Sequence, residues 1–239
     1  IINLLVPISS FEGDLKPESS IGYNLGIDLS FDTKLKINLN LFRNEINNLI
    51  DTRVIATKSN GQNVFSYYNV NEIYTQGFEF NAILKFSKNS IIRAGYQLLY
   101  AKDKKAVQAF KNGEVFARLT PTSPAFVLSE RDYFGLLNRS RHMINFKLSY
   151  RLEKWNLESN IRATYRSKFG LYDSNGNGYL DTYDTFVSGY SIFDFAINKT
   201  IFKQYKLGFG MDNFLDFQDT QNISNIAGTI VYGNITINF

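Results

Sequence analysis

The sequence contains no cysteine among its 239 residues and a single histidine, His142. The lack of cysteine excludes disulfides, thiolate metal sites and cysteine nucleophiles. With one histidine, neither a histidine-based zinc site nor a Ser-His-Asp triad is easily assembled. We therefore expect a protein that is not an enzyme and has no catalytic residues.

Long apolar runs are also missing. No stretch approaches the roughly 18 uninterrupted apolar residues that a membrane-spanning helix needs. The opening segment 1–6 is too short for a signal-peptide core and lacks a basic region before it. The net charge of +4 is spread along the chain, so no nucleic-acid partner is expected. A β-barrel is still compatible with these absences, because its lipid-facing residues alternate with lumen-facing ones.

Aromatic residues, in contrast, are abundant, with 15 Tyr and 21 Phe. Such residues favour pleated, half-buried surfaces. Apolar and polar residues alternate along nearly the whole chain, as where Tyr23, Leu25 and Ile27 are interleaved with Asn24 and Gly26. The pattern predicts nine strands, at about 23–31, 35–41, 78–86, 92–100, 144–152, 155–165, 190–199, 205–213 and 230–239.

The connections between these strands alternate between short and long. Short turns are predicted at 32–34, 87–90, 152–154 and 200–204, and long polar links at about 57–70, 102–141, 168–188 and 215–228. Short connections at one edge and long ones at the other are typical of outer-membrane barrels, with turns in the periplasm and loops outside. Aromatic residues near the strand ends fit an interfacial girdle.

A soluble β-sandwich, meander or carbohydrate-binding module would show the same alternation. Two features favour a membrane barrel instead. Several strands reach about ten residues, near the length a barrel strand needs. Their polar faces also carry opposed charges at close spacing, as a wet lumen allows. We therefore predict an all-β protein, the wall of an antiparallel transmembrane β-barrel in contact with membrane lipid.

The odd number of strands has a further consequence. If the short turns are periplasmic, the chain starts outside and leaves its C-terminus in the periplasm. Single-chain bacterial barrels have an even number of strands, and open edges in lipid would leave backbone groups unpaired. We therefore expect residues 1–239 to be the C-terminal part of a larger barrel in the bacterial outer membrane.

Several stretches resemble the C-terminal half of TonB-dependent outer-membrane receptors. Their order and spacing along nearly the whole chain carry the resemblance more than any one of them. The matching segments are Leu15-Lys16-Pro17-Glu18-Ser19-Ser20 with Tyr23-Asn24-Leu25-Gly26, Tyr68-Asn69-Val70-Asn71 with Gly77-Phe78-Glu79-Phe80, Arg141-His142-Met143-Ile144-Asn145, Met211-Asp212-Asn213-Phe214-Leu215-Asp216, and the end Tyr232-Gly233-Asn234-Ile235-Thr236-Ile237-Asn238-Phe239. Ser140-Arg141 stands where that family more often has a proline.

The resemblance implies a barrel of about 22 strands around an N-terminal plug. It also implies active import, coupled to TonB, of a scarce bulky nutrient such as a ferric siderophore, haem or cobalamin. The plug, the TonB contact and the earlier strands would lie N-terminal to residue 1, and a surface lipoprotein is a further partner to consider. A passive porin or a surface adhesin without energy coupling is the alternative.

Segment 173–184, DSNGNGYLDTYD, has the spacing of an EF-hand calcium loop. Calcium takes six to eight oxygen ligands, and a tight turn through glycine lets alternate residues converge on one ion. Two departures are an aspartate at the last position, where a bidentate glutamate is usual, and the absence of flanking helices. A solvated Gly/Asn turn is the alternative. We predict a structural calcium site in an external loop, with the ligands Asp173, Asn175, Asn177, Tyr179, Asp181 and Asp184.

Other polar residues have simpler interpretations. For His142, we favour a structural hydrogen bond over haem ligation. Charged residues on the strand faces are expected to line the lumen rather than to form catalytic pairs: Asp28, Glu79, Arg93, Arg151, Glu158 and Arg162. The long link 102–141 is the best candidate for contact with a ligand or partner, because loops of that length are often functional.

Overall fold

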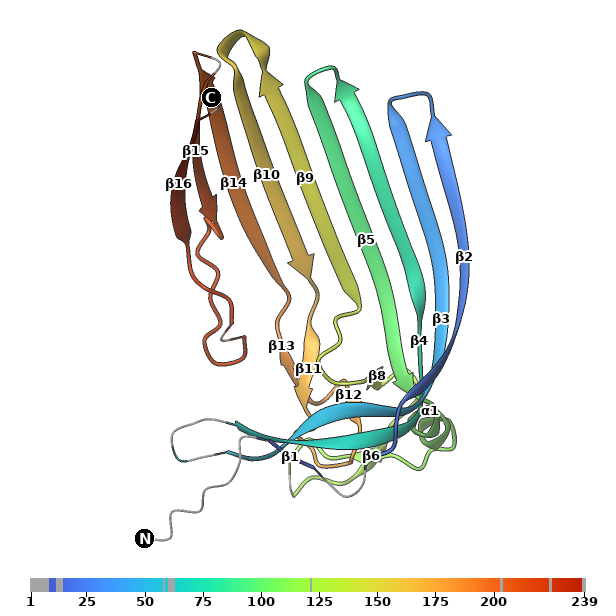
Figure 1. The fold of residues 1–239 in the computed structure, drawn as a ribbon. Coiled ribbons are helices and arrows are strands. Elements are labelled where there is room, and N and C mark those ends of the chain that lie inside the picture. The colour runs from blue at the N-terminus through green and yellow to red at the C-terminus, as the bar shows by residue number, and fades with distance from the viewer. Residues whose placement is uncertain are drawn as a thin grey trace.

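The structure is a computed structural model that describes residues 9–11, 15–57, 59, 63–120, 122–202, 204–223 and 225–237. Nine strands stand side by side in one antiparallel sheet (Figure 1), in the order β16-β15-β14-β10-β9-β5-β4-β3-β2. Their bounds are β2 Ser19–Phe31, β3 Leu35–Thr57, β4 Asn63–Ser87, β5 Ser90–Asp103, β9 His142–Leu152, β10 Leu157–Arg166, β14 Tyr190–Ile201, β15 Tyr205–Asp212 and β16 Ile230–Ile237. Within the described residues β2 and β16 do not pair with each other, so the sheet is open.

The register of this sheet places like side chains on the same face. Leu39 lies opposite Phe80, and Phe80 lies opposite Tyr96, which continues an apolar row across three strands. One residue further along, Asn40 lies opposite Glu79. Because side chains alternate in direction along a strand, one face of the wall is apolar and the other is polar. The fold class and the nine-strand wall predicted from the sequence are therefore confirmed.

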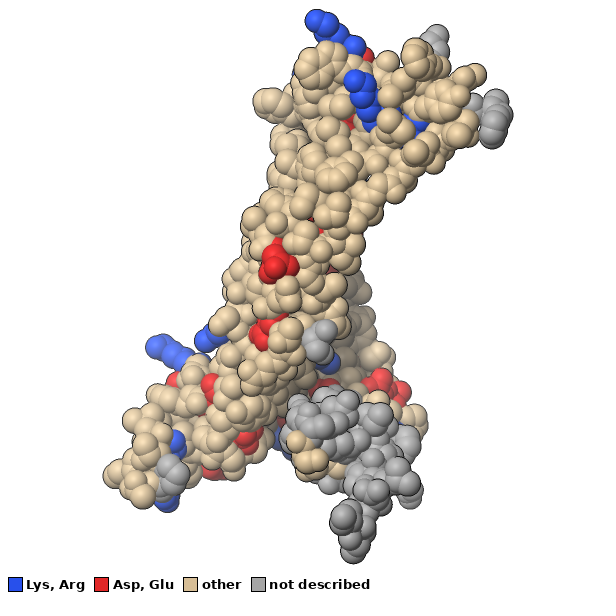
Figure 2. Space-filling view, turned by 90° about the vertical axis from the view of Figure 1, so that its left-hand side faces the viewer, with Lys and Arg blue, Asp and Glu red and all other residues tan. Residues whose placement is uncertain are grey.

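The apolar face is left open to the surroundings. Large hydrophobic side chains on β2 and β16 are among the most exposed, with Leu25 66% and Ile235 70% exposed. In a water-soluble sandwich such a face would be covered by a second sheet. Figure 2 shows that the middle of the wall is mainly uncharged, whereas charged side chains gather toward its two ends.

Cross-strand hydrogen bonds tie the polar face together. Asn38 Nδ2 donates to Asp28 Oδ1 at 2.9 Å, and Gln97 Nε2 donates to Glu79 Oε1 at 2.8 Å. The Arg162 Nε donates to Asp194 Oδ2 at 2.6 Å across β10 and β14. The charged residues predicted to face a lumen thus lie on the polar face, and Asp28, Glu79 and Arg162 are hydrogen-bonded to neighbouring strands.

Short turns close one end of the wall and long connections leave the other end, as predicted. Several strands are longer than predicted, and two differences matter most. Residues 63–70 were expected in a link but belong to β4, because β3 and β4 continue pairing as far as Thr57 and Asn63. The backbone ladder continues here although the alternation of apolar and polar residues has ended. We call the end of the wall with the long connections the loop end. The extended halves of β3 and β4 run across it in Figure 1.

The second difference concerns Trp155, which the alternation assigned to a strand. It lies instead in the 3₁₀ turn η1 Glu153–Trp155, and β10 begins at Leu157. Asn156 takes a left-handed backbone conformation, with φ 46°, which reverses the chain direction. The last predicted strand residues, 238–239, and the opening segment 1–6 lie outside the described residues.

Shorter elements occupy the loop end. No helix in the described part of the chain is long and apolar enough to cross a membrane. The helix is α1 Lys104–Lys111, and the short strands are β1 Ser9–Phe11, β6 Phe116–Ala117, β7 Phe126–Val127, β8 Tyr133–Gly135, β11 Phe169–Tyr172, β12 Leu180–Asp181 and β13 Thr185–Val187.

Candidate functional site: the loop cap and the wall beneath it

The connection between β5 and β9 folds into a compact unit at the loop end. Its helix α1 begins where β5 ends, and Asp103 caps it by accepting hydrogen bonds from the backbone N–H groups of Lys105 and Ala106. A small hydrophobic core forms around the helix, with Phe110 stacked on Tyr133 at 5.0 Å between ring centroids. The buried residues of this core are Ala106, Phe110, Val115, Ala117, Leu128 and Tyr133. We call residues 103–141 and 167–189 together the loop cap.

The two connections of the loop cap are joined to each other. β12 pairs with β8, and the Thr182 N–H donates to the Asp132 carbonyl at 3.0 Å. Tyr179 places its ring edge against Phe110 at 5.6 Å, which extends the core into the second connection. Two loops that are 26 or more residues apart in sequence therefore form one structure at the loop end of β5, β9 and β10.

Cationic and aromatic side chains meet where the loop cap joins the wall. The Arg141 guanidinium lies 4.0 Å from the centre of the Phe134 ring, and its Nη2 donates to the Phe134 carbonyl at 2.8 Å. The Lys168 ammonium lies 4.6 Å from the Phe186 ring. Burial lowers the pKa of Arg141, and no carboxylate among the described residues pairs with it. Such contacts hold cations by the negative faces of aromatic rings.

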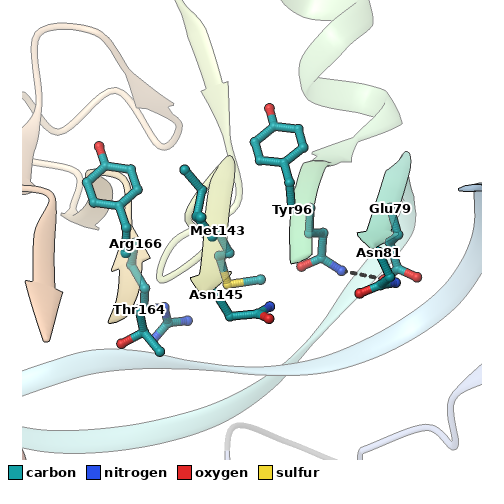
Figure 3. Close-up of a pocket in the computed structure, with 10 residues that line it drawn as sticks. Glu79, Asn81, Tyr96, Met143, Asn145, Thr164 and Arg166 are labelled. Atoms are coloured by element: carbon teal, nitrogen blue, oxygen red, sulfur yellow. Dashed lines mark hydrogen bonds between the residues drawn. The ribbon is translucent and has the colours of Figure 1, made fainter. Parts of the chain in front are cut away.

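A pocket of about 380 Å³ opens on the polar face at the loop end of the wall. Figure 3 shows side chains from four neighbouring strands around it, with Asn145 and Arg166 on the pocket side and the Tyr96 ring directed away. Its polar lining residues are Glu79, Asn81, Gln97, Asn145, Thr164 and Arg166. This mixture of amides and opposite charges can hydrogen-bond a polar solute.

The predicted calcium ligands lie in the loop cap, between β11 and β13. Three of them converge, since Asn175 Nδ2 and Asn177 Nδ2 both donate to Asp181 Oδ2, at 2.9 and 2.7 Å. Asp181 is fully buried. Asp173 instead accepts from the backbone N–H groups of Gly176 and Gly178.

Asp184 closes the same loop from its far end. Its carboxylate accepts from the backbone N–H groups of Ser174 and Asp181, at 2.9 and 2.8 Å. Burial raises the pKa of Asp184. Across the described residues, no three His, Cys, Asp or Glu side chains converge as a metal site would require. The oxygen-rich set of carboxylates, amides and the Tyr179 carbonyl is nevertheless the chemistry that calcium prefers, so the calcium site stays a prediction.

His142 makes a structural contact, as expected. Its Nδ1 lies 2.8 Å from the Tyr96 hydroxyl, and its backbone N–H donates to Ser167 Oγ at 3.0 Å. The hydrogen bonds tie the start of β9 to β5 and to the end of β10.

Residues from two of the family-like motifs meet at the loop end of β3. Asn69 Nδ2 donates to the carbonyls of Lys16 and Asn48, while its Oδ1 accepts from the Lys16 N–H at 2.8 Å. Glu18 Oε1 accepts from the Ile50 N–H at 2.5 Å. These residues clamp the segment that leads into β2 against the extended hairpin.

A third motif organises the connection between β15 and β16. Asn213 is buried and takes a left-handed conformation, with φ 50°. Its Nδ2 donates to the carbonyls of Phe217 and Ala227, at 2.8 and 2.9 Å. Asp216 Oδ1 accepts from the Thr229 N–H at 2.9 Å, and this hydrogen bond is the main reason that the pKa of Asp216 is lowered.

Sequence reasoning identified the 102–141 link as important but missed the helix inside it. Two signals were available. Asp103 directly precedes the helix and is a favoured N-cap residue, and Ala106 and Phe110 recur at helical spacing. The helix has eight residues, too few for the periodicity to stand out among strands.

A family model of the TonB dependent receptor-like β-barrel matches residues 5–214. Among solved structures, the chain is similar to the ferric enterobactin receptor of Pseudomonas aeruginosa, solved as a mutant with enterobactin: 19% identity, 96% of this chain, 33% of that chain and a TM-score of 0.63. The siderophore receptor PirA of Acinetobacter baumannii is 21% identical, over 95% of this chain and 32% of that chain, with a TM-score of 0.60. The FrpB iron transporter of Neisseria meningitidis is 17% identical, over 97% of this chain and 32% of that chain, with a TM-score of 0.59.

These likenesses concern the fold. The chain spans about a third of the length of the solved proteins it matches. The comparison with curated proteins gives no match.

Proposed function

Because this chain belongs to the TonB-dependent receptor family and matches its β-barrel, we propose that it contributes to active import across the bacterial outer membrane. Residues 1–239 form the C-terminal part of the barrel wall, with the C-terminus in the periplasm. The plug, the TonB contact and the remaining strands belong to the rest of the receptor.

One observation carries this proposal. The chain forms a nine-strand antiparallel wall with one apolar and one polar face, closed by short turns at one end and covered by a folded loop cap at the other. A wall of this kind separates lipid from a wet lumen. The loop cap then lies outside the cell, where a nutrient is first met, and the pocket of Figure 3 lies on the path beneath it.

The cargo that fits best is a ferric siderophore. Three similar structures are described as receptors or transporters for ferric enterobactin, siderophores or iron. The cations at the base of the loop cap, Arg141 and Lys168, are held by aromatic rings rather than by carboxylates, which leaves their charge available to an anionic ligand. Haem and cobalamin are the competing cargoes.

Transport by the intact receptor tests this proposal. Cells that depend on this receptor for iron are supplied with radiolabelled ferric siderophores, haem or cobalamin, with and without a functional TonB. We expect uptake of a ferric siderophore that requires TonB. Uptake that is independent of TonB, or limited to small solutes, would identify a passive porin instead. Adhesion without uptake would identify an adhesin.

We also propose that calcium orders the 173–184 segment of the loop cap. The convergence of Asn175 and Asn177 on the buried Asp181 supports this idea, as do the left-handed glycines Gly176 and Gly178. Rotation of the two amides would turn their oxygens toward a bound ion. The ion would then replace amide N–H groups as the partner of the Asp181 carboxylate.

Hydrogen exchange of the full-length receptor, in calcium and in EGTA, measures this effect. We expect calcium to increase protection within 173–184, and Asp181→Asn to abolish the increase. Asp219→Asn is the matched control, because Asp219 lies in a different loop and binds Asn222. Equal protection in calcium and EGTA would contradict the proposal.

A further inference from the structure

The short-turn end of the wall is strongly basic. We define the short-turn edge as residues 31–36, 85–90, 151–158 and 199–206. By sequence, it holds nine of the chain's 26 Lys and Arg but only three of its 22 Asp and Glu. The rest of the chain therefore has two more acidic than basic residues, so the positive net charge comes from this edge. Figure 2 shows Lys and Arg gathered at the corresponding end.

Each of the four short turns combines a lysine with an exposed aromatic residue. The lysines are Lys34, Lys88, Lys154 and, by sequence, Lys203. The aromatic residues are Phe31, Phe86, Trp155 and Phe202, which are 55%, 75%, 59% and 85% exposed. Rings at this level of a barrel lie at the boundary between acyl chains and headgroups. An adjacent lysine can then extend its ammonium into the headgroup layer.

The acidic residues of the edge pair with only some of its lysines. Glu153 pairs with Lys88 at 3.3 Å, and Glu158 pairs with Arg151 and with Lys206. Among the described residues, Lys34, Lys85, Lys154 and Lys199 make no ion pair, and all four are exposed. Exposed ion pairs such as Lys88–Glu153 also contribute little energy, so that lysine too can exchange its partner.

We propose that the short-turn edge binds the headgroups of anionic phospholipids, such as phosphatidylglycerol, in the adjacent leaflet. The proposal rests on the membrane placement proposed above. The unpaired lysines lack an anionic partner, and a phosphodiester supplies both negative charge and hydrogen-bond acceptors. The acyl chains of the same lipid cover the exposed rings. An acidic soluble protein would match the charge, but it would leave the four aromatic side chains in water.

The fluorescence of Trp155, the single tryptophan of this chain, can report this binding directly. The full-length receptor is reconstituted into phosphatidylcholine vesicles that contain an equal fraction of brominated phosphatidylglycerol or brominated phosphatidylcholine. Subtracting the signal of Trp155→Phe removes any other tryptophan of the receptor. Bromine quenches tryptophan at short range, so quenching measures which lipid occupies the edge.

We expect brominated phosphatidylglycerol to occupy the edge with a relative binding constant about 2- to 5-fold above that of phosphatidylcholine, since one lysine near an anionic surface contributes an effect of this size. High salt should reduce the ratio toward 1. The triple variant Lys34→Gln, Lys88→Gln, Lys154→Gln should also lose it. The control variant Lys16→Gln, Lys105→Gln, Lys111→Gln removes the same charge from the loop end and should retain the ratio.

The outcomes separate the two proposals. Equal quenching by both brominated lipids places Trp155 in the membrane but overturns the anionic-lipid site, and then an acidic protein partner would explain the charge. Quenching by neither lipid overturns the membrane placement itself. A preference that survives in the short-turn triple variant would show that these lysines are not the binding groups.

Discussion

The wall and the loop cap of this protein are stabilised in different ways. The wall has few buried hydrophobic side chains, because its apolar face is exposed and its polar face is hydrogen-bonded across strands. The loop cap has a core of its own, centred on Phe110 and Tyr133. The wall therefore depends on its backbone ladder and on lipid, whereas the loop cap depends on the packing of a small water-soluble unit.

This difference means that the two parts should fail independently. A change in the core of the loop cap should loosen the two connections without opening the strands. A charge on the apolar face should destabilise the wall in the membrane without altering the cap. Each of the following predictions tests one side of the comparison, in order of decreasing effect.

Phe110→Ala should have the largest effect. Removing a buried phenylalanine from a packed core costs about 3–5 kcal/mol, and Phe110 contacts both Tyr133 and Tyr179. Hydrogen exchange of the full-length receptor should show lost protection in 104–135 and in 173–184. The strands of the wall should keep their protection. Phe116→Ala, at a half-exposed position in the same connection, is the control. Loss of protection confined to 104–135 would show that the two connections fold separately.

Ile161→Lys should be the next largest change. Ile161 lies in the middle of β10 on the apolar face, and a lysine at the bilayer midplane costs about 2–4 kcal/mol. Equilibrium unfolding from lipid vesicles measures this cost. The neighbouring change Asn160→Lys places the same charge on the polar face and should cost little. Equal costs for the two variants would contradict the assignment of the faces.

Asn213→Ala should destabilise the connection between β15 and β16 by about 1–3 kcal/mol. It leaves the Phe217 and Ala227 carbonyls without their donor and puts alanine in a left-handed conformation. Asn213→Gly separates the two causes, because glycine accepts the conformation without strain. Hydrogen exchange within 214–229 is the measurement. If glycine restored full protection, the side-chain hydrogen bonds would contribute nothing.

The smallest effect concerns pH. The lowered pKa of Asp216 means that its carboxylate binds the Thr229 N–H better when ionised. A carboxyl group with a lowered folded pKa stabilises the fold above its unfolded value, near pH 4, and loses that contribution as the pH falls through the folded pKa. Protection of the Thr229 amide, corrected for intrinsic exchange, should therefore drop below about pH 4. In Asp216→Asn this pH dependence should disappear.

The wall could be predicted from the sequence because its physics is periodic. Alternation along β5 or β9 directly records which side faces lipid, and one residue of slip would reverse both faces. The alternation did not reveal how far β3 and β4 extend. Their outer halves, such as residues 63–70, pair through the backbone, but their apolar residues fall on both faces and no alternation marks them.

The loop cap could not be predicted to the same degree. Its core joins Phe110 to Tyr179, which lie 69 positions apart, and no local pattern encodes such a contact. The calcium-like spacing located the segment 173–184 but could not show that Asn177 also donates to the Phe116 carbonyl of the first connection. Asn69 and Asn213 were singled out by the family resemblance, and only the structure explains them, as side chains that bind backbone groups far away in sequence.

The pairing of β12 with β8 has a consequence for how such receptors diversify. Loops carried by a rigid scaffold usually tolerate change independently of one another. Here the second connection completes the core of the first, through Tyr179. A graft of either segment alone would carry half of a folded unit onto the new scaffold. The two connections must therefore be exchanged together, in evolution as in design.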